Sequence, residues 1–372
     1  MDSLRDVLFF LPDLDGGGAQ RTVVNLANRL PRERYRATIA AVRCDGPMRE
    51  WLDDEIELVD LNAGRIRHAL WPLRRVLKER GPDILFSTIL DANIVAVAAT
   101  QALITRPQLV LRETNSLRAR GDIGPLRRQL IRWAYARADA LVALSHGVGR
   151  ELAADFSLTS ARLHKIWNPV DLAVVRQYAA EGAPALEPFD GVTLVAAGRL
   201  HCQKGFDILI RALGALNRPD LRLIVLGDGD EALALHELVR TLGLSKNVLF
   251  PGFIENPYPW IAAADLFVLS SRWEGFGHVL VEAMACGTAV LSTNCPHGPA
   301  DIVEHDVDGR LVVSEDEAAL AEAISQLADS PELRARFVAA GMAKVERFDA
   351  ACIAEEYALL FDDLLSSTGV AA

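Results

Sequence analysis

Val192-Thr193-Leu194-Val195-Ala196-Ala197-Gly198-Arg199-Leu200-His201-Cys202-Gln203-Lys204-Gly205 joins an apolar run to a short loop that carries two cations. An uncharged run of this length is typical of a buried parallel strand, and Gly198 ends it. Arg199 and Lys204 follow, and a helical pattern begins at 205. Arginine offers a planar fork for phosphate oxygens, lysine a mobile charge and a helix N-terminus free N–H groups. The loop therefore suits a diphosphate; the alternative is a pair of solvated surface bases.

Strand-like runs alternate with helical patterns on both sides of this segment, which predicts parallel sheets covered by helices on both faces. Before it, we expect strands at 7–11, 37–42, 57–60, 84–87, 108–111, 140–144 and 162–166, and helices at 19–30, 66–80, 92–104, 124–137 and 146–155. After it, we expect strands at 221–226, 247–250, 266–270 and 289–292, and helices at 205–216, 231–243, 257–263, 278–286 and 317–328.

The pattern restarts after a loop rich in Pro, Ala, Glu and Gly at 181–191, so two doubly wound units follow each other in the chain. We place the first domain at 1–175 and the second at 176–349, and expect a tail helix over 350–368 to pack back onto the first. The 372 residues, of which 51% are hydrophobic, suffice for two cores. Ligands of such sheets bind at the carboxyl ends of the strands, so the chemistry should lie on the loops that follow strands.

Charge is unevenly distributed along the chain. The formal net charge is −11, but residues 1–150 hold 23 Lys and Arg against 18 Asp and Glu. The first half therefore suits an anionic partner. Five cysteines at wide spacing, without a CxxC pair, make a metal site improbable. We expect neither a transmembrane helix nor a signal peptide, because no uncharged apolar run reaches eighteen residues and the first six residues include two acids.

A second loop, Ser271-Arg272-Trp273-Glu274-Gly275-Phe276-Gly277-His278-Val279-Leu280-Val281-Glu282-Ala283, follows the expected strand at 266–270. Its Gly-Phe-Gly turn allows a ligand to approach the backbone closely. Glu274 precedes the turn, and Glu282 falls within an otherwise apolar helix. A carboxylate in such a place costs several kcal/mol, roughly, unless it has partners, and the hydroxyls of a ribose are suitable ones. The alternatives are a structural salt bridge and a solvated face.

These residues, taken together, resemble glycosyltransferase family 4, a retaining family with the GT-B fold of two Rossmann-like domains that face each other across a cleft. The resemblance extends over nearly the whole chain and looks closest to the members that build surface polysaccharides and lipid-linked oligosaccharides. Its motifs are Glu274-x7-Glu282, Gly198-Arg199-Leu200, Lys204-Gly205, Gly16-Gly17-Gly18-Ala19-Gln20-Arg21, Asn168-Pro169-Val170-Asp171, Gly227-Asp228-Gly229 and Cys295-Pro296-His297-Gly298-Pro299.

The resemblance implies a division of roles. Arg199 and Lys204 would hold the donor diphosphate and stabilise the leaving nucleotide, Glu274 would contact the sugar hydroxyls, and Glu282 would bind the ribose. Segments 227–229 and 253–254 would flank the base, and 16–18 would close over the donor phosphate or the acceptor. Besides Glu282, the donor-binding residues that the resemblance implies are Gly16, Gly17, Gly18, Gly198, Gly227, Gly229, Phe253, Ile254, Gly275, Phe276, Gly277, His278 and Val279. Such enzymes need no metal or cofactor, because cations and helix N-termini supply the positive field.

One loop departs from the common family pattern. Many members carry a histidine after the fourth or fifth strand of the first domain, whereas this chain reads Leu111-Arg112-Glu113-Thr114-Asn115-Ser116. Glu113, or Asn115, is a candidate to position the sugar in its place. His146 and His201 are more typical of loop histidines than of catalysts.

Arginines cluster between 118 and 137, opposed only by Asp122. Leu126, Leu130, Trp133 and Ala134 share one face of the expected helix. Basic amphipathic helices with a tryptophan often lie on anionic membranes; the alternative is a core-facing helix with solvated arginines. The candidate membrane or acceptor residues are Arg118, Arg120, Arg127, Arg128, Arg132 and Trp133. No nucleic-acid motif accompanies the cluster, so we expect no nucleic-acid partner.

The sequence thus predicts a metal-independent enzyme that moves a hexose or N-acetylhexosamine from a UDP- or GDP-sugar to a hydroxyl of a lipid-linked or glycan acceptor. We expect a cytoplasmic protein, peripheral on the cytoplasmic face of the inner membrane. One alternative is a GT-B enzyme of the synthase or epimerase type with a small soluble acceptor. Another is a non-catalytic nucleotide-binding protein, against which the incomplete GxGxxG at 227–230 argues.

Overall fold

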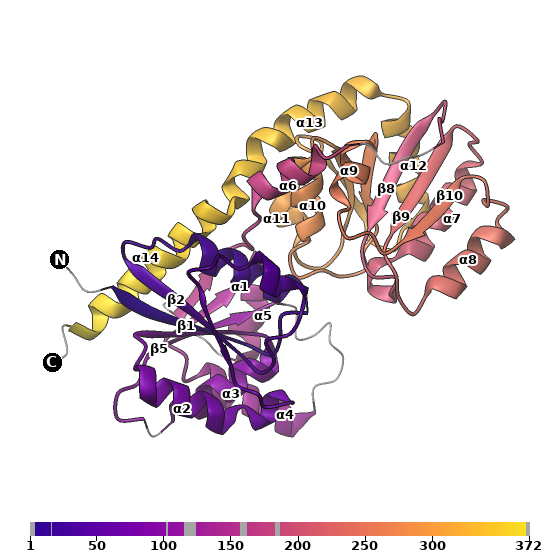
Figure 1. Cartoon of the computed structure of the whole chain (residues 1–372). Coiled ribbons are helices and arrows are strands. Elements are labelled where there is room, and N and C mark those ends of the chain that lie inside the picture. Colours follow the sequence, from indigo (N-terminus) through magenta and orange to yellow (C-terminus); the bar gives the residue numbers. More distant parts are fainter. Residues whose placement is uncertain are drawn as a thin grey trace. The chain divides into compact units, whose positions relative to one another are not determined.

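The computed structural model describes residues 4–15, 17–101, 103–114, 124–156, 162–182 and 187–369. The chain forms two compact units: unit 1 is Met1–Val170 with Phe348–Ala372, and unit 2 is Asp171–Arg347 (Figure 1). From the sequence we placed the boundaries at 175/176 and 349/350. The chain returns to unit 1 at Phe348. There the N–H of Val170 donates to the carbonyl of Phe348 at 3.0 Å, and the N–H of Ala350 donates to the carbonyl of Val170 at 2.9 Å.

Unit 1 is built on a seven-stranded sheet in the order β3-β2-β1-β4-β5-β6-β7, in which all pairings are parallel. The strands are β1 (Arg5–Leu11), β2 (Tyr35–Ala41), β3 (Glu57–Asp60), β4 (Ile84–Thr88), β5 (Gln108–Glu113), β6 (Ala140–Ala143) and β7 (Leu163–Lys165). The order reverses between β1 and β4, so this is the switch point of the sheet.

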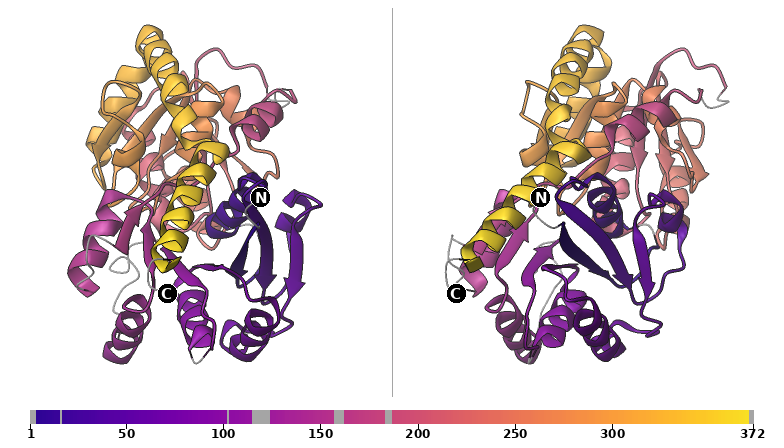
Figure 2. Two further views of the ribbon diagram at one scale, coloured as in Figure 1. Left: turned by 90° about the vertical axis from the view of Figure 1, so that its left-hand side faces the viewer. Right: turned by 60° about the vertical axis from the view of Figure 1, so that its left-hand side comes forward.

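Helices cover both faces of this sheet. One face packs against α2 (Leu70–Arg80), α3 (Leu90–Thr100), α4 (Pro125–Tyr135) and α5 (His146–Phe156), which share one apolar core with the sheet. The other face holds α1 (Gly18–Arg29) and α14 (Ala350–Gly369), which pack against each other (Figure 2). Short 3-10 turns lie at Pro47–Trp51 and Ile66–His68.

Helix α14 closes the second face of the unit 1 sheet although it comes from the far end of the chain. The ring of Tyr357 meets the ring of Phe86, on β4, edge to face at 5.5 Å between centroids. The hydroxyl of Tyr35, on β2, donates to the carbonyl of Ala358 at 3.1 Å. The tail helix therefore packs on the first unit of the chain.

Unit 2 repeats the plan with six parallel strands in the order β10-β9-β8-β11-β12-β13. The strands are β8 (Val192–Ala197), β9 (Leu221–Leu226), β10 (Val248–Gly252), β11 (Leu266–Leu269), β12 (Ala289–Asn294) and β13 (Arg310–Val313). Helices α7 (Phe206–Leu216), α8 (Ala232–Thr241) and α12 (Glu317–Ala328) share one core with the sheet. Helices α6 (Leu172–Ala179), α9 (Tyr258–Ala262) and α10 (His278–Ala285) pack together away from that core, and α11 (Pro299–Ile302) and α13 (Pro331–Val345) complete the unit.

The predicted fold class is confirmed: both units are doubly wound α/β with parallel sheets. Among the α-helices and β-strands of the described residues, α6, α11, β13 and α13 were not predicted. Strand β13 was missed because its apolar run is only Leu311-Val312-Val313, too short for a periodicity argument. Helix α13 buries few of its residues, which weakens the helical pattern.

No helix in the described part of the chain combines the length and the apolar character needed to cross a bilayer.

Candidate active site

The cationic loop and the glutamate loop follow adjacent strands. β8 lies between β9 and β11, and the strand order of unit 2 reverses there. Residues 198–205 follow β8, and residues 270–277 follow β11. The two motifs therefore meet at the switch point, where open parallel sheets leave room for a ligand.

Direct hydrogen bonds tie the two loops together. The N–H of Arg272 donates to the carbonyl of Gln203 at 2.7 Å, and the side-chain amide of Gln203 donates to the carbonyl of Trp273 at 3.0 Å. The Arg272 guanidinium forms a bidentate pair with Asp207, at 2.9 and 2.8 Å. Burial alone would raise the pKa of Asp207, but the hydrogen bond and charge of Arg272 outweigh it, so that this pKa is lowered. The bidentate pair therefore stays ionised and fixes the loops.

Lys204 and Glu274 form the central ion pair of the site. The Nζ of Lys204 lies 2.6 Å from the Oε1 of Glu274, and the Ser271 hydroxyl donates to the same oxygen at 2.7 Å. Glu274 is only 7% exposed. Among the described residues, its Oε2 has no protein partner, so this oxygen remains available as an acceptor for a ligand hydroxyl.

Arg199 differs from Lys204 although both lie on the loop after β8. Its side chain is exposed, and it forms no hydrogen bond or ion pair with any residue that the structure describes. Its fork is thus open to an anionic ligand.

Glycines allow the loops around β8 to approach one another. A Cβ on Gly205, where φ is +60°, would lie 2.2 Å from the carbonyl oxygen of Ser270. A Cβ on Gly227 would lie 2.0 Å from the carbonyl oxygen of Gly198, and one on Gly229 would lie 2.4 Å from that of Leu200. The glycines at 198, 227 and 229 therefore shape this edge of the sheet.

Helix α10 presents an open N-terminus beside Glu274. Its N-cap is Gly277, with φ of 100°, and no side chain caps the first turn. Phe276 is buried, and its ring meets the ring of His278 edge to face at 5.4 Å. Gly275 is buried, and Val279 is half-buried in the first turn of the helix. Free N–H groups at a helix start favour a negative ligand.

Glu282 lies one helical turn further on and is 5% exposed. The hydroxyl of Tyr258, on α9, donates to its Oε1 at 3.4 Å. Phe253 and Ile254 follow β10; the Phe253 ring is exposed and the Ile254 side chain is half-buried. Apart from Glu282, which lies within α10, these predicted donor residues of unit 2 lie on loops or helix starts at the carboxyl ends of the strands.

The predicted residues of unit 1 lie at the ends of β1 and β5. Gly16 lies outside the described residues; Gly17 is the N-cap of α1, and Gly18 is its first residue. The Glu113 carboxylate is fully buried; the hydroxyl of Tyr135 donates to its Oε2, and the N–H of Thr114 donates to its Oε1 at 3.1 Å.

The basic segment divides into two parts. Arg118 and Arg120 lie outside the described residues, whereas Arg127 pairs with Asp91 at 2.8 Å. Arg128 is exposed, and Arg132 donates to the carbonyl of Asp155 at 3.4 Å. Trp133 packs against the unit 1 core.

The apolar face of α4 extends beyond the core. Leu126 is 81% exposed and Leu130 is also exposed, whereas Ala134 is buried. The two leucines therefore lie at the surface near the exposed arginine Arg128.

Two groups of residues were not predicted from the sequence. Arg272, Asp207 and Ser271 hold the site together, but nothing in a single sequence pairs residues so far apart. Arg65 and Arg67 line a cavity in unit 1, and their position after the strand at 57–60 was a usable signal. Among the described residues, no group of three His, Cys, Asp or Glu side chains could hold a metal ion.

Comparisons with known proteins identify the family and the fold class of the chain. A sequence model described as "Glycosyltransferase Family 4" matches residues 16–174, and one described as "Glycosyl transferases group 1" matches residues 184–344. The fold and the site define a glycosyltransferase of the GT-B class. The chain belongs to glycosyltransferase family 4, as its motifs predicted.

Two bacterial relatives match most of the chain. The "N-acetylgalactosamine-N,N'-diacetylbacillosaminyl-diphospho-undecaprenol 4-alpha-N-acetylgalactosaminyltransferase" of Campylobacter jejuni is 28% identical, over 76% of this chain and 77% of its own. The "lipopolysaccharide core biosynthesis glycosyltransferase LpsD" of Rhizobium meliloti is 29% identical, over 93% and 95%. Among solved structures, Alr3699/HepE of Anabaena in complex with UDP superposes with a TM-score of 0.81 at 23% identity, over 96% of this chain and 100% of that one.

Proposed function

We propose that this chain transfers a hexose or N-acetylhexosamine from a UDP- or GDP-sugar to a hydroxyl of a lipid-linked or glycan acceptor, with retention of configuration and without a metal ion. The observation that carries the proposal is the Lys204–Glu274 ion pair at the switch point, in which Glu274 is buried and Lys204 is half-buried, on loops that also present the open Arg199. The names of the two relatives, with a diphospho-undecaprenol and a lipopolysaccharide core, support the acceptor class. The UDP complex of the Anabaena protein supports the donor class.

The cations would act on the donor diphosphate. An ammonium has three N–H donors, and Lys204 directs one to Glu274, so that others can meet phosphate oxygens. Arg199 would add its fork, and the uncapped start of α10 would add backbone N–H groups. As the bond between the anomeric carbon and the diphosphate oxygen breaks, this fixed positive field would stabilise the leaving nucleotide.

The carboxylates would orient the donor. The free Oε2 of Glu274 would accept a hydrogen bond from a sugar hydroxyl, and Glu282 would accept from the ribose diol. Phe253 and Ile254 would flank the base together with Gly227 and Gly229. The leaving phosphate oxygen would take the proton of the acceptor hydroxyl, so the reaction does not require a protein base.

Residues of unit 1 also have proposed roles in binding the donor or the acceptor. Segment 16–18 would close over the donor phosphate or the acceptor. Glu113 would take the sugar-positioning role of the usual histidine, either directly or by holding the loop that follows it. The exposed face of α4, with Arg128 and Leu126, would lie on an anionic membrane surface at the cytoplasmic side of the inner membrane.

A panel of nucleotide sugars tests the donor class. The expected result is a rise in melting temperature and slow donor hydrolysis with one UDP- or GDP-sugar. Glu274→Ala and Lys204→Ala should each abolish turnover, since one removes the sugar contact and the other a diphosphate cation. Melting curves of both variants check folding, because each substitution leaves the other charge of a partly buried pair without its partner, at a cost of up to about 3–5 kcal/mol. Intact activity in both variants would show that the site is assigned wrongly.

Metal independence and retention have their own measurements. With the active donor, an excess of EDTA should leave the rate unchanged, because Arg199 and Lys204 neutralise the diphosphate. An α-linked donor should give an α-linked product by NMR. If EDTA abolishes activity and added Mg²⁺ restores it, the enzyme depends on a metal ion. If the product is β-linked, the enzyme inverts the configuration.

Acceptor assays separate the remaining alternatives. Transfer to a small soluble sugar, and none to a lipid-linked glycan, would favour the synthase or epimerase type. Donor binding without hydrolysis or transfer to any acceptor would favour a non-catalytic nucleotide-binding protein.

A further inference from the structure

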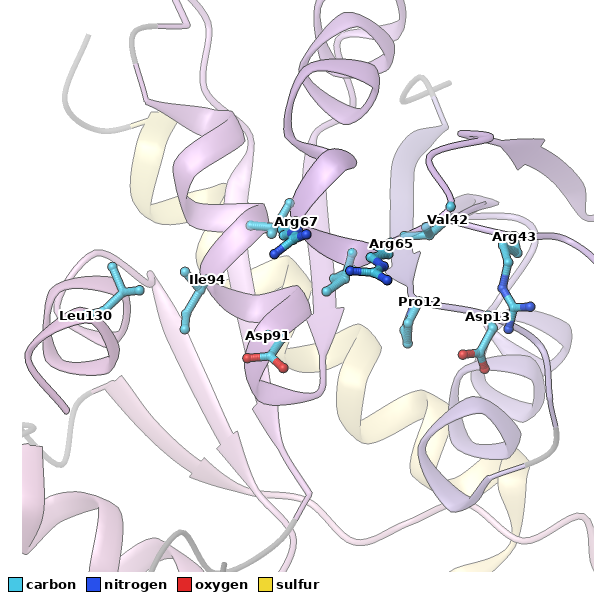
Figure 3. A pocket seen from close by; sticks show the side chains of 12 residues that line it. Pro12, Asp13, Val42, Arg43, Arg65, Arg67, Asp91, Ile94 and Leu130 are labelled. Atoms are coloured by element: carbon cyan, nitrogen blue, oxygen red, sulfur yellow. The ribbon is translucent and has the colours of Figure 1, made fainter. Parts of the chain in front are cut away.

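Unit 1 contains a cavity of about 640 Å³ that the donor site does not use. Its walls are the segments that follow successive strands: Pro12 and Asp13 after β1, Val42 and Arg43 after β2, and 64–67 after β3. Asp91 and Val95 of α3, which follows β4, complete it with Ile94 and Leu130 (Figure 3). The cavity therefore lies at the carboxyl edge of the sheet, and its volume is within the range of small-molecule sites, roughly 300–1,000 Å³.

The charges that line this cavity leave an excess of positive charge. Asp91 is already paired with Arg127 at 2.8 Å, and Arg43 with Asp15 at 3.0 Å. Arg65 and Arg67 are exposed, and neither meets a carboxylate among the described residues; the Nε of Arg67 donates only to the Nε2 of His68, at 3.3 Å. Two guanidinium forks are thus open, and such forks match phosphate oxygens in a bidentate manner.

Other groups of the cavity suit the rest of a glycan carrier. Asp13 accepts from the side chain of Gln20 at 2.7 Å and adds oxygens that can accept from sugar hydroxyls. Ile94 and Leu130 form an apolar end, and in the view of Figure 3 Arg65 and Arg67 lie between this end and Arg43 with Asp13. Leu130 is itself exposed and continues to Leu126 on the same helix. The lining thus combines an anion site with an apolar exit.

We infer that this cavity binds the phosphate group of the acceptor, with Arg65 and Arg67 as its ligands. The inference rests on the proposed function, because it names the acceptor of that same reaction. The phosphate belongs either to the diphosphate that joins a glycan to a polyprenyl lipid or to a phosphorylated sugar without a lipid. The donor diphosphate has its own cations in unit 2, so the two phosphate sites are separate in the sequence.

Titration with inorganic diphosphate tests the site. The full-length protein is saturated with UDP, which fills the donor site, and diphosphate binding is then measured by calorimetry. Arg65→Gln/Arg67→Gln should weaken this binding at least tenfold, because two charged hydrogen bonds are lost. The matched control is Arg5→Gln/Arg36→Gln, which removes two exposed charges from the amino ends of β1 and β2, and it should bind as the wild type does. Equal binding by all three proteins, or equal loss in both double variants, overturns the inference.

The same titration separates this inference from the proposed function. If UDP does not bind, the donor assignment fails, and the diphosphate titration is repeated in a Lys204→Gln background. A loss of diphosphate binding that depends on Arg65 and Arg67 would then still support phosphate binding in the cavity. Both double variants should keep the rise in melting temperature that UDP produces, which shows that unit 2 is intact.

Two probes distinguish the sources of the phosphate. Farnesyl diphosphate stands for the lipid-linked carrier, and glucosamine 6-phosphate for a phosphorylated sugar. The probe that displaces inorganic diphosphate at the lower concentration, in a manner that requires Arg65 and Arg67, identifies the acceptor class. Displacement by neither probe overturns the inference.

Discussion

Gly205 separates the Lys204 ammonium from the first turn of α7 and adopts a left-handed conformation with φ of +60°. It lies close to the carbonyl oxygen of Ser270, at the end of the neighbouring strand β11. The Ser270 hydroxyl, in turn, donates to the carbonyl of Lys204 at 2.9 Å. The position of Lys204 thus depends on a residue without a side chain.

Gly205→Ala should destabilise the protein more than an alanine at a comparable glycine. The matched control is Gly243→Ala in the same unit, where φ is +70° and no atom lies within 4 Å of the added Cβ. In the control, the loss of stability comes only from placing an alanine in the left-handed conformation, which costs about 1–2 kcal/mol. Gly205→Ala adds a clash with the Ser270 oxygen, so its unfolding free energy in urea should fall by a further 1 kcal/mol or more, roughly. Equal losses in both variants would show that the loops can separate at no cost.

Cys202 offers a reporter for the donor site because it lies between Arg199 and Lys204. It is exposed, as is Cys352 on α14. Burial raises the pKa of Cys44 to about 11 and the pKa of Cys286 and Cys295 to about 12, so these three thiols react slowly at pH 8. A thiol reagent should therefore label Cys202 and Cys352 first.

A bound donor should protect Cys202 from that reagent. We expect UDP to slow labelling of Cys202 several-fold, because the nucleotide diphosphate would cover the loop. Labelling of Cys352 should not change, and peptide mass spectrometry measures both sites in one experiment. Equal slowing at both cysteines, or none at Cys202, would contradict a diphosphate on this loop.

At the scale of elements, helix α14 shows how a distant segment completes a domain. Without α14, unit 1 would expose part of one face of its sheet, because α1 and α14 cover this face together. Tyr357 is fully buried between the Phe86 and Phe361 rings, whereas Leu359, two residues further along α14, is 57% exposed.

Two alanine substitutions on this helix should differ in their effect on the free energy of unfolding. Tyr357→Ala should lower the unfolding free energy by about 3–5 kcal/mol, the usual cost of deleting a buried aromatic ring. Leu359→Ala should change it by less than about 0.5 kcal/mol, because that side chain is largely in solvent. Urea denaturation followed by tryptophan fluorescence measures both. A small loss for Tyr357→Ala would mean that α14 is not part of the cooperative unit.

The elements and the site were predictable to different degrees. Buried strands such as β8 and strongly periodic helices such as α12 could be located from the sequence, because one local pattern specifies each of them. The family resemblance placed Lys204 and Glu274 in one donor site, but it did not predict the ion pair between them. The Arg272–Asp207 tether and the Arg65–Arg67 cavity depend on how separate loops meet, and no local pattern records such contacts.

At the scale of the whole molecule, charge and exposed apolar groups coincide in unit 1. The acidic excess of the chain falls after residue 150, so the basic excess belongs to the first half. On α4, Leu126 is almost fully exposed, with Arg127 and Arg128 beside it in the chain. Leu126 and Leu130 are both exposed on this helix, and exposed leucines beside arginines are the arrangement that an amphipathic helix uses at a lipid interface.

Binding to anionic vesicles should therefore depend on α4 and on salt. In a flotation assay at low ionic strength, we expect binding to phosphatidylglycerol vesicles and little to neutral ones. Arg127→Gln/Arg128→Gln/Arg132→Gln should lose about 1 kcal/mol per charge, roughly a hundredfold in affinity for the triple variant. The matched control is Arg32→Gln/Arg36→Gln/Arg80→Gln, which removes three exposed arginines from other parts of unit 1. At 0.5 M salt the wild type should also detach, because the charges are then screened within a few ångströms. If both triple variants bind equally well, α4 does not carry the membrane contact.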